Sequence, residues 1–235
     1  MTVLCVDTSA AVSVSLLSDD GTAIASRTLR EQRRHAELLT PLIKEIFDES
    51  GLDSSSVTTV VAGTGPAPFT GLRVGLVTGR TFAFGVGTEP LGVCSLDALA
   101  AEAAQIHALE AGTKVLAVSD ARRREVYYAL YTVGELTAQG VPEVTVVEGP
   151  EVASAADLIE TGLARGAVVV GEGAALYAEA FAGADVRSAP AVPSTTVLAQ
   201  LALARRGAGV DQPTTPLYLR RPDAQVPGAR KRALG

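Results

Sequence analysis

The first thirty residues alternate between apolar runs and turn-forming residues in a way that predicts three strands. Residues 3–6 form a continuous apolar run, which is typical of a central strand, whereas residues 12–16 alternate between valine or leucine and serine. A predicted turn at 19–21 leads into a third strand at 22–29. The chain therefore begins with three successive strands.

The next segment carries the spacing of an amphipathic helix. Apolar residues recur every three or four positions over 35–50, with charged residues opposite them, and Gly51 is expected to end the helix. Pro41 leaves two alternatives. It either kinks this helix or occupies its first position, with Thr40 as the cap.

Five further elements are predicted before residue 110, in the order strand, loop, helix, strand, helix: 57–62, 63–71, 72–86, 91–94 and 95–107. Ser95 can cap the last helix. The loop GTGPAPFTG could bind an anion at the helix N-terminus that follows it. Pro66 and Pro68 lack amide hydrogens, however, so a rigid structural turn is the favoured interpretation.

The pattern restarts after Gly112. The segment VLAVSDARRREVYYALY (115–131) is similar to VLCVDTSAAVSVSLL (3–17), because each has an apolar strand, a terminal aspartate, a polar turn and an alternating strand. The remaining predicted elements are two strands and three helices: 144–147, 167–170, 153–164, 174–182 and 194–206. We interpret this as an internal duplication.

Two βββαβα units, each opening with an aspartate-bearing hairpin, describe the two-lobed α/β fold shared by actin, hexokinase-like kinases and chaperone ATPases (ASKHA). The predicted divisions are an N-terminal lobe at 1–110, a C-terminal lobe at 111–209 and an extension at 210–235 that packs on the first lobe and ends in a disordered basic tail, RRPDAQVPGARKRALG. A modest contact of that tail to RNA or to a protein is the alternative.

The amino-acid composition and net charge argue against some classes of function. The 235 residues are 47% hydrophobic and 20% charged, which is ordinary for a globular protein, and the formal net charge is −6. A protein that held RNA unaided would more often be basic. The apolar N-terminus lacks a basic leader, and no run approaches the roughly 18 apolar residues of a membrane span. A cytoplasmic location is therefore expected.

The cleft of such a fold needs small residues that let backbone amides approach phosphate, and an aspartate for Mg²⁺. Asp7-Thr8-Ser9 would be acceptable, but the second hairpin offers three arginines, Arg122 to Arg124, in place of glycine. The Gly-Glu-Gly turn at 171–173 is interpreted as a plain strand-to-helix turn. No cofactor is predicted.

Metal and nucleophile chemistry is also poorly supported. The two histidines, His35 and His107, are far apart, and no HxxxH pair exists. We expect His35 to cap or pack. Cys5 and Cys94 lie in apolar runs and are interpreted as buried hydrophobes.

The segment GLRVGLVTGRTFAFGVG predicts a helix that is apolar or small on nearly every side. Gly71, Gly75, Gly79 and Ala83 form one stripe at four-residue spacing. Each glycine disfavours a helix by about 1 kcal/mol, so the stripe suggests a purpose. A second subunit lying on the stripe is favoured over burial against the chain itself, and Gly75→Leu is then expected to block association without disturbing the fold.

Several motifs together resemble the TsaB family, also called YeaZ. They are VDTS near the N-terminus, RxHAELLTPLI at 33–43, GPAPFTGLRVG at 65–75, SDARRREVYYALY at 119–131 and LYLRRPDA at 217–224. The resemblance spans nearly the whole chain. Ala67 and Pro68 stand where the family usually has Gly-Ser, which stiffens the loop.

The resemblance implies a non-catalytic dimerisation subunit in the synthesis of threonylcarbamoyladenosine next to the tRNA anticodon. Its implied partners are a TsaD-type paralogue that carries the metal-binding histidine pair, a TsaE-type ATPase, and a second copy of itself on the same surface; tRNA is met only within the complex. The expected interface lies on the helices near 35–50 and 71–86, at His35, Leu39, Leu42, Gly71, Leu72, Arg73, Gly75, Leu76, Gly79 and Arg80. An ATP-dependent small-molecule kinase and a metallopeptidase are the alternatives.

Overall fold

The computed structural model describes residues 1–31 and 34–220. Within these residues no helix combines the length and the apolar character that crossing a membrane requires. The predicted basic tail lies outside the described residues, apart from Arg220 at its start.

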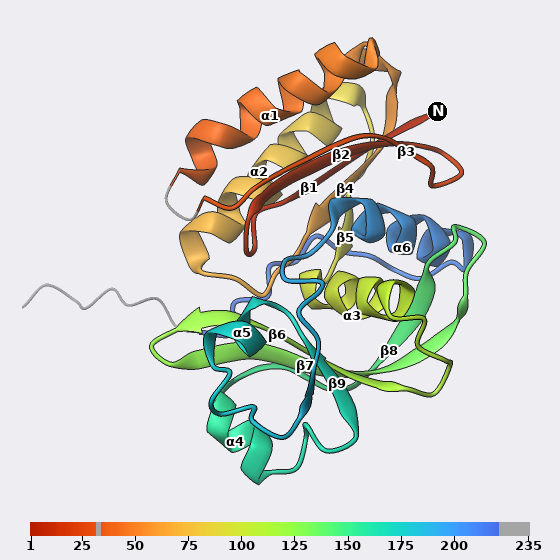
Figure 1. Cartoon of the computed structure of the whole chain (residues 1–235). Coiled ribbons are helices and arrows are strands. Elements are labelled where there is room, and N and C mark those ends of the chain that lie inside the picture. Colours follow the sequence, from red (N-terminus) through yellow and green to blue (C-terminus); the bar gives the residue numbers. More distant parts are fainter. Residues whose placement is uncertain (32–33, 221–235) are drawn as a thin grey trace, which may run out of the picture.

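The first lobe is a five-stranded sheet with the strand order β3-β2-β1-β4-β5 (Figure 1). Its strands are β1 (Thr2–Asp7), β2 (Val12–Ser18), β3 (Ala23–Leu29), β4 (Val57–Gly63) and β5 (Leu91–Val93). The first three strands are antiparallel neighbours, and β4 and β5 continue the sheet in parallel with β1. The strands predicted in this half of the chain are confirmed.

Helices α1 (His35–Ser50) and α2 (Phe69–Val86) cover one face of this sheet (Figure 1). Gly51 ends α1 in the left-handed conformation, as predicted. Pro41 lies inside α1, so the alternative in which it begins the helix is wrong. Helix α3 (Ser95–Ile106) begins at Ser95, so the residue at the cap position is Cys94 and the prediction that Ser95 caps this helix is wrong. The Ser95 hydroxyl instead donates a hydrogen bond to Asp7.

The second lobe repeats the first. Its sheet has the order β10-β9-β6-β7-β8, which is the order of the first sheet when each strand is matched to its counterpart. Its elements are β6 (Lys114–Arg122), β7 (Glu125–Leu136), β8 (Pro142–Ser154), α4 (Ala155–Glu160), β9 (Ala167–Val170), α5 (Glu172–Leu176), β10 (Asp185–Val186) and α6 (Thr195–Gly207). The duplication is confirmed, although α4 and α5 are shorter than predicted.

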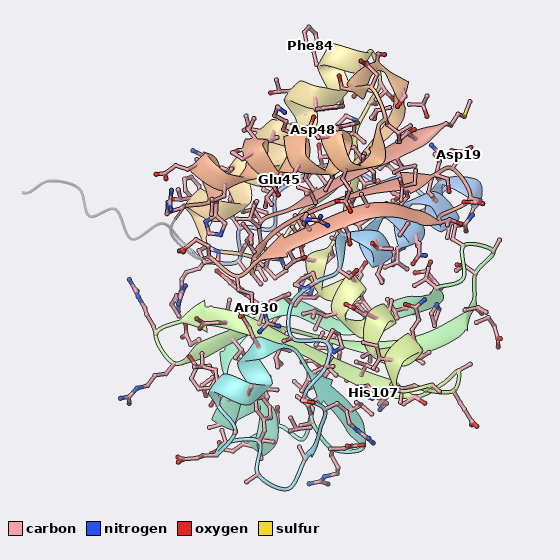
Figure 2. The ribbon with its side chains drawn as sticks, turned by 45° about the horizontal axis from the view of Figure 1, so that its top comes forward. Asp19, Arg30, Glu45, Asp48, Phe84 and His107 are labelled. Carbon is pink, nitrogen blue, oxygen red and sulfur yellow. The ribbon has the colours of Figure 1, made fainter. Side chains whose placement is uncertain are left out.

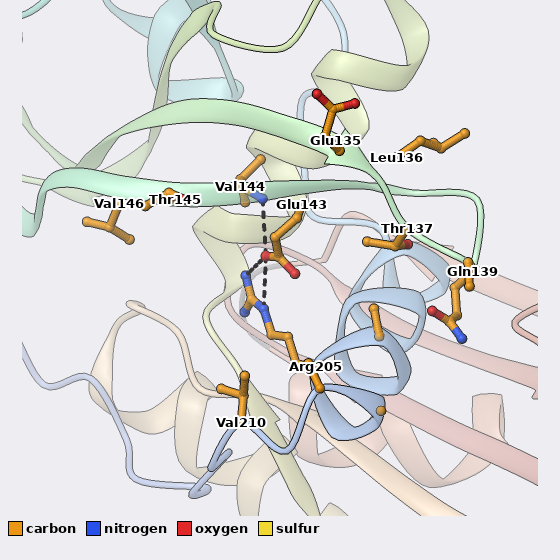
Figure 3. Close-up of a pocket in the computed structure, with 14 residues that line it drawn as sticks. Glu135, Leu136, Thr137, Gln139, Glu143, Val144, Thr145, Val146, Arg205 and Val210 are labelled. Atoms are coloured by element: carbon orange, nitrogen blue, oxygen red, sulfur yellow. Dashed lines mark hydrogen bonds and ion pairs between the residues drawn. The ribbon is translucent and has the colours of Figure 1, made fainter.

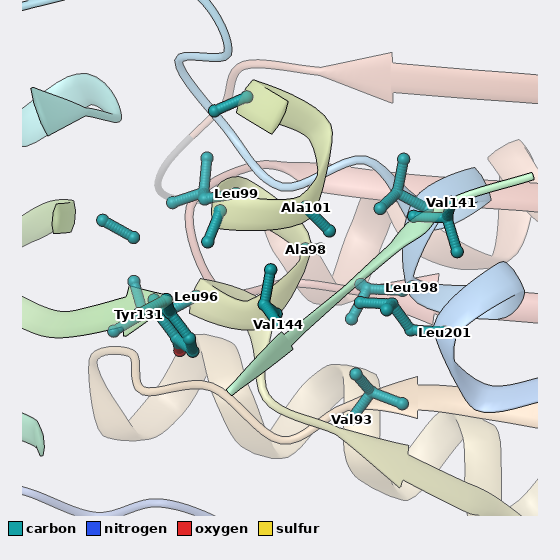
Figure 4. Packing of buried hydrophobic residues seen from close by; sticks show 14 of the residues in the cluster. Val93, Leu96, Ala98, Leu99, Ala101, Tyr131, Val141, Val144, Leu198 and Leu201 are labelled. Carbon is teal, nitrogen blue, oxygen red and sulfur yellow. The ribbon is translucent and has the colours of Figure 1, made fainter. Parts of the chain in front are cut away.

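Helices α3 and α6 form a layer between the two sheets (Figure 1). Among the described residues, the largest buried cluster lies here and joins both lobes, since it contains Val93 of the first sheet with Tyr131 and Val144 of the second (Figure 4). Two other clusters lie under α1 and α2 and beside α4 and α5. The lobes therefore share one central core.

A polar network strengthens this central layer. The Arg205 guanidinium of α6 pairs with Glu143 of β8 at 2.6 Å (Figure 3) and with Asp97 of α3, also at 2.6 Å. The Tyr131 hydroxyl donates to the same Asp97 at 2.7 Å. Beyond α6, the chain returns to the first lobe, where the Leu217 amide donates to the Thr64 carbonyl at 3.0 Å.

Candidate functional site

In the first aspartate-bearing hairpin, neighbouring residues of the chain hydrogen-bond to both oxygens of the Asp7 carboxylate. Asp7, at the end of β1, is 1% exposed. One carboxylate oxygen accepts from the amide and hydroxyl of Ser9, at 2.9 and 2.6 Å, and the other accepts from the Ser95 hydroxyl at 2.5 Å. Burial raises the pKa of Asp7, and these hydrogen bonds oppose the rise. A side chain at Gly63 would overlap the oxygen that accepts from Ser95, so the carboxylate is packed closely against the end of β4.

Thr8 fastens this hairpin to α2. Its hydroxyl donates to the Gly71 carbonyl at 2.7 Å and accepts from the Gly75 amide at 3.0 Å. The hydroxyl that would border a phosphate in an active member of this fold is therefore already hydrogen-bonded within the chain, and its one donor is occupied.

The second hairpin, between β6 and β7, has an unusual backbone. Arg122, Arg123 and Arg124 have φ angles of 64°, 56° and 65°. This left-handed region costs a residue with a side chain roughly 1–2 kcal/mol, and turns of this kind prefer Asn-Gly. Asp120 accepts from the Arg122 amide at 2.8 Å and pairs with the Arg122 guanidinium at 3.0 Å. Its carboxylate is thus engaged as well.

The Gly-Glu-Gly turn is a packing feature. A side chain at Gly171 would overlap the Val118 carbonyl, which explains the glycine. The Gly171 amide donates to Pro190 at 3.0 Å and the Glu172 amide donates to Ala191 at 2.8 Å. The donors that would cradle a phosphate are occupied by the chain, and the prediction of a plain strand-to-helix turn is confirmed.

The loop before α2 is similarly built into the core. Residues 63–67 are buried. The Thr64 amide donates to the Val93 carbonyl at 2.8 Å, and the Gly65 carbonyl accepts from the Ser95 amide at 2.8 Å. These contacts agree with the interpretation of a rigid structural turn.

A pocket of about 570 Å³ lies between the lobes, near the Gly-Glu-Gly turn. Arg30 from the end of β3, Glu102 from α3 and the segment 189–194 line it. One Glu102 carboxylate oxygen is buried without a hydrogen-bond partner among the described residues, and burial raises the Glu102 pKa to about 7. Sequence reasoning missed this residue, because a glutamate in an alanine-rich helix gives no local signal of its surroundings.

The histidines and cysteines lie apart. His35 begins α1 and packs near Gly71; burial lowers its pKa, whereas Asp7 raises it. His107 contacts the Ala189 carbonyl at 2.7 Å. Burial raises the pKa of both Cys5 and Cys94. Among residues 1–31 and 34–220, no group of three His, Cys, Asp or Glu side chains could hold a metal ion.

The ten residues predicted for the partner interface differ in their exposure to solvent. Seven lie on the buried sides of α1 and α2: Leu39, Leu42, Gly71, Leu72, Gly75, Leu76 and Gly79. His35 is half-buried, and Arg73 and Arg80 are exposed. Gly75 faces Thr8, and Gly79 faces Ala62 and Val6 of the sheet. The interpretation that the glycine stripe faces a second subunit is therefore wrong: the missing side chains let α2 approach its own sheet.

The opposite face of α2 is open to solvent and carries large apolar side chains. Val77 is 59% exposed and Phe84 is 88% exposed, and Phe84 projects away from the body of the protein (Figure 2). Arg73 lies over the Phe69 ring, 3.8 Å from its centroid, and donates to the Tyr218 hydroxyl at 3.1 Å. The four-residue spacing from Phe69 through Arg73 to Val77 was the sequence signal for this face.

Comparisons with known proteins agree with the fold. The family model described as "TsaD: tRNA N6-adenosine threonylcarbamoyltransferase" matches residues 24–219. An uncharacterized protein of Mycobacterium tuberculosis is 36% identical over 227 residues, which cover 95% of this chain and 94% of that protein. The tRNA threonylcarbamoyladenosine biosynthesis protein TsaB of Escherichia coli is 32% identical over 152 residues, 65% of this chain and 64% of that protein.

Among solved structures, an uncharacterized Pseudomonas aeruginosa protein described as similar to the peptidase YeaZ superposes with a TM-score of 0.77 at 30% identity. That match covers 93% of this chain and 99% of the other. A structure named YeaZ from the same organism superposes with a TM-score of 0.73 at 27% identity, over 92% and 100% of the two chains. With the duplicated lobes and the family-model match, these similarities show that the chain belongs to the TsaB (YeaZ) family.

Proposed function

We propose that this chain is a non-catalytic subunit that binds and supports a TsaD-type threonylcarbamoyltransferase in tRNA modification. The observation that carries the proposal is that the phosphate-facing groups of the cleft are already hydrogen-bonded within the chain. Asp7, Thr8 and the amides of Gly171 and Glu172, which would meet a nucleotide's phosphates, are hydrogen-bonded within the chain. A kinase of this fold would need these groups for its substrate.

The comparisons support the pathway. The Escherichia coli relative is named as a threonylcarbamoyladenosine biosynthesis protein, and the matching family model describes the transferase itself. A chain that shares the transferase fold, and whose phosphate-facing groups are hydrogen-bonded within the chain, suits a supporting role. With a net charge of −6, it is expected to meet tRNA only within an assembly, in the cytoplasm.

The surface best suited to the partner is the exposed face of α2 and the adjoining part of α1. Val77 and Phe84 are exposed apolar side chains of the kind that anchor interfaces. The buried members of the predicted set, such as Leu39 and Leu76, would hold these helices in place from beneath. A TsaD-type paralogue is proposed to bind here, a TsaE-type ATPase to join the pair, and a second copy to occupy the face when the chain is alone.

Light scattering tests the proposal. The mass of the chain is measured alone and after mixing with the TsaD-type paralogue from the same organism, with and without the TsaE-type ATPase and ATP. A one-to-one heterodimer that replaces any homodimer is the expected result. Absence of association under every condition, together with tight Mg-ATP binding by the isolated chain in calorimetry, would contradict the proposal and favour the kinase alternative.

A further inference from the structure

The tip of the β6–β7 hairpin has arginines at turn positions where asparagine and glycine are preferred. Arg122 pairs with Glu125 across the hairpin, so Arg123 and Arg124 are the two central turn residues. Both have positive φ, as does Arg122. Asn-Gly would form such a turn with less strain. Residues that keep an unfavourable local conformation tend to lie at functional sites.

The charge at this tip is opposite to that of the protein as a whole. Arg122, Arg123 and Arg124 are all exposed, and Arg220 joins them by donating to the Ala121 carbonyl at 2.6 Å. Asp120 pairs with Arg122, and Glu125 pairs with Arg220. Four guanidinium groups therefore gather at one end of the second lobe, in a chain whose net charge is −6.

We propose that the hairpin tip, Arg122 to Arg124, contacts the phosphate backbone of RNA, which in the assembled complex is that of the tRNA. This inference rests on the proposed function, because it names a surface by which the subunit would meet the substrate of its partner. Guanidinium groups bind phosphate oxygens through paired hydrogen bonds, and such contacts position an RNA without reading its sequence.

The composition of the tip favours RNA over a protein partner. Interfaces between proteins generally have an apolar or aromatic centre. At this tip Ala121 is buried and the next three residues are arginines, so within 121–124 no large apolar side chain is exposed. The hairpin belongs to the second lobe, whereas α1 and α2 belong to the first lobe (Figure 1). The proposed phosphate contact and the proposed partner surface therefore use different elements of the chain.

A substitution that improves the turn while removing the charge tests this inference. The double variant Arg123→Asn with Arg124→Gly supplies the preferred turn residues, so it is expected to fold with a Tm within about 5 °C of the parent's. The assembled complex carrying it is expected to bind an in vitro transcribed tRNA roughly five- to tenfold more weakly. The slope of log affinity against log salt should fall by about 0.7–0.9 for each phosphate group that the variant no longer binds.

Two matched variants separate local from general charge effects. Arg165→Ala with Arg187→Ala removes two exposed arginines elsewhere in the second lobe and is expected to leave tRNA affinity within about twofold of the parent. Arg123→Lys with Arg124→Lys keeps the charge and should retain most of the affinity. Unchanged affinity and salt slope in the Asn-Gly variant would overturn the inference, as would equal weakening by the Arg165 and Arg187 pair.

Assembly is measured separately by light scattering on the same samples. If the Asn-Gly variant no longer bound the TsaD-type partner, the hairpin would be a protein contact and the inference would be overturned. If the parent chain did not assemble at all, the proposed function would fail. The hairpin would then be judged by titrating tRNA into the isolated chain at low salt, where the same ranking of variants is expected.

Discussion

The Thr8 hydroxyl accepts a hydrogen bond from the Gly75 amide at 3.0 Å, which holds the β1–β2 turn directly against α2. A side chain at position 75 would overlap this hydroxyl. The contact gives the glycine stripe a structural cause, since α2 can lie this close to the sheet only where side chains are missing. The expectation that Gly75→Leu leaves the fold intact is therefore wrong.

Gly75→Ala should destabilise the protein by about 1–3 kcal/mol, because the methyl group displaces Thr8 or shifts α2. Gly85→Ala is the matched control in the same helix, where an added methyl group meets nothing within 4 Å. It should leave stability unchanged or raise it by up to about 1 kcal/mol. Urea unfolding measures both; equal effects of the two substitutions would contradict this account of the stripe.

The exposed face of α2 should control association. Val77→Asp combined with Phe84→Asp places two charges on the proposed interface and is expected to weaken assembly with the paralogue at least tenfold. Because both side chains are largely exposed, stability should change by less than about 1 kcal/mol. Leu136→Asp, at a position 68% exposed in the second lobe, is the control that should assemble normally. Light scattering or calorimetry distinguishes these outcomes.

Glu102 should make stability depend on pH. Burial raises its pKa from 4.5 to about 7, so the folded state binds more protons than the unfolded state between these pH values. The free energy of unfolding should therefore fall as pH rises through this window. Glu102→Gln cannot ionise and should lose this slope, gaining about 1–3 kcal/mol relative to the parent between pH 5 and pH 8. Urea titrations across that range test it; parallel curves would contradict the assignment.

The ion pair between Arg205 and Asp97 should contribute far more than a surface pair. Asp97 is 6% exposed, and Asp97→Ala leaves the partly buried Arg205 with Glu143 as its remaining ion-pair partner and removes the acceptor of the Tyr131 hydroxyl. This substitution is expected to cost about 2–4 kcal/mol. Asp48→Ala breaks the exposed pair with Lys44 in α1 and should cost no more than about 0.5 kcal/mol. Thermal or urea unfolding compares the two, and a destabilisation at Asp97 as small as that at Asp48 would refute the prediction.

Sequence patterns were sufficient for the architecture. Apolar alternation and helical spacing depend on which side of an element is buried, and that requirement is already present in the order of residues. The repeated strand–aspartate–turn–strand pattern likewise predicted two similar lobes, which the shared strand order confirms. The Gly-Glu-Gly turn was predicted as a structural turn for its composition, and the contact of Gly171 with Val118 supplies the reason.

What the sequence could not decide was which face of α2 meets the chain itself. Periodicity separates the stripe of Gly71, Gly75 and Gly79 from the face of Val77 and Phe84, but both faces are small or apolar. Only the placement of Thr8 and Ala62 beneath α2 assigns the glycines to the interior. The isolated oxygen of Glu102 is similarly a tertiary result, because its surroundings include segments distant in the chain. The sequence alone therefore determined the elements and their repetition, whereas tertiary packing decided which surfaces remain for partners.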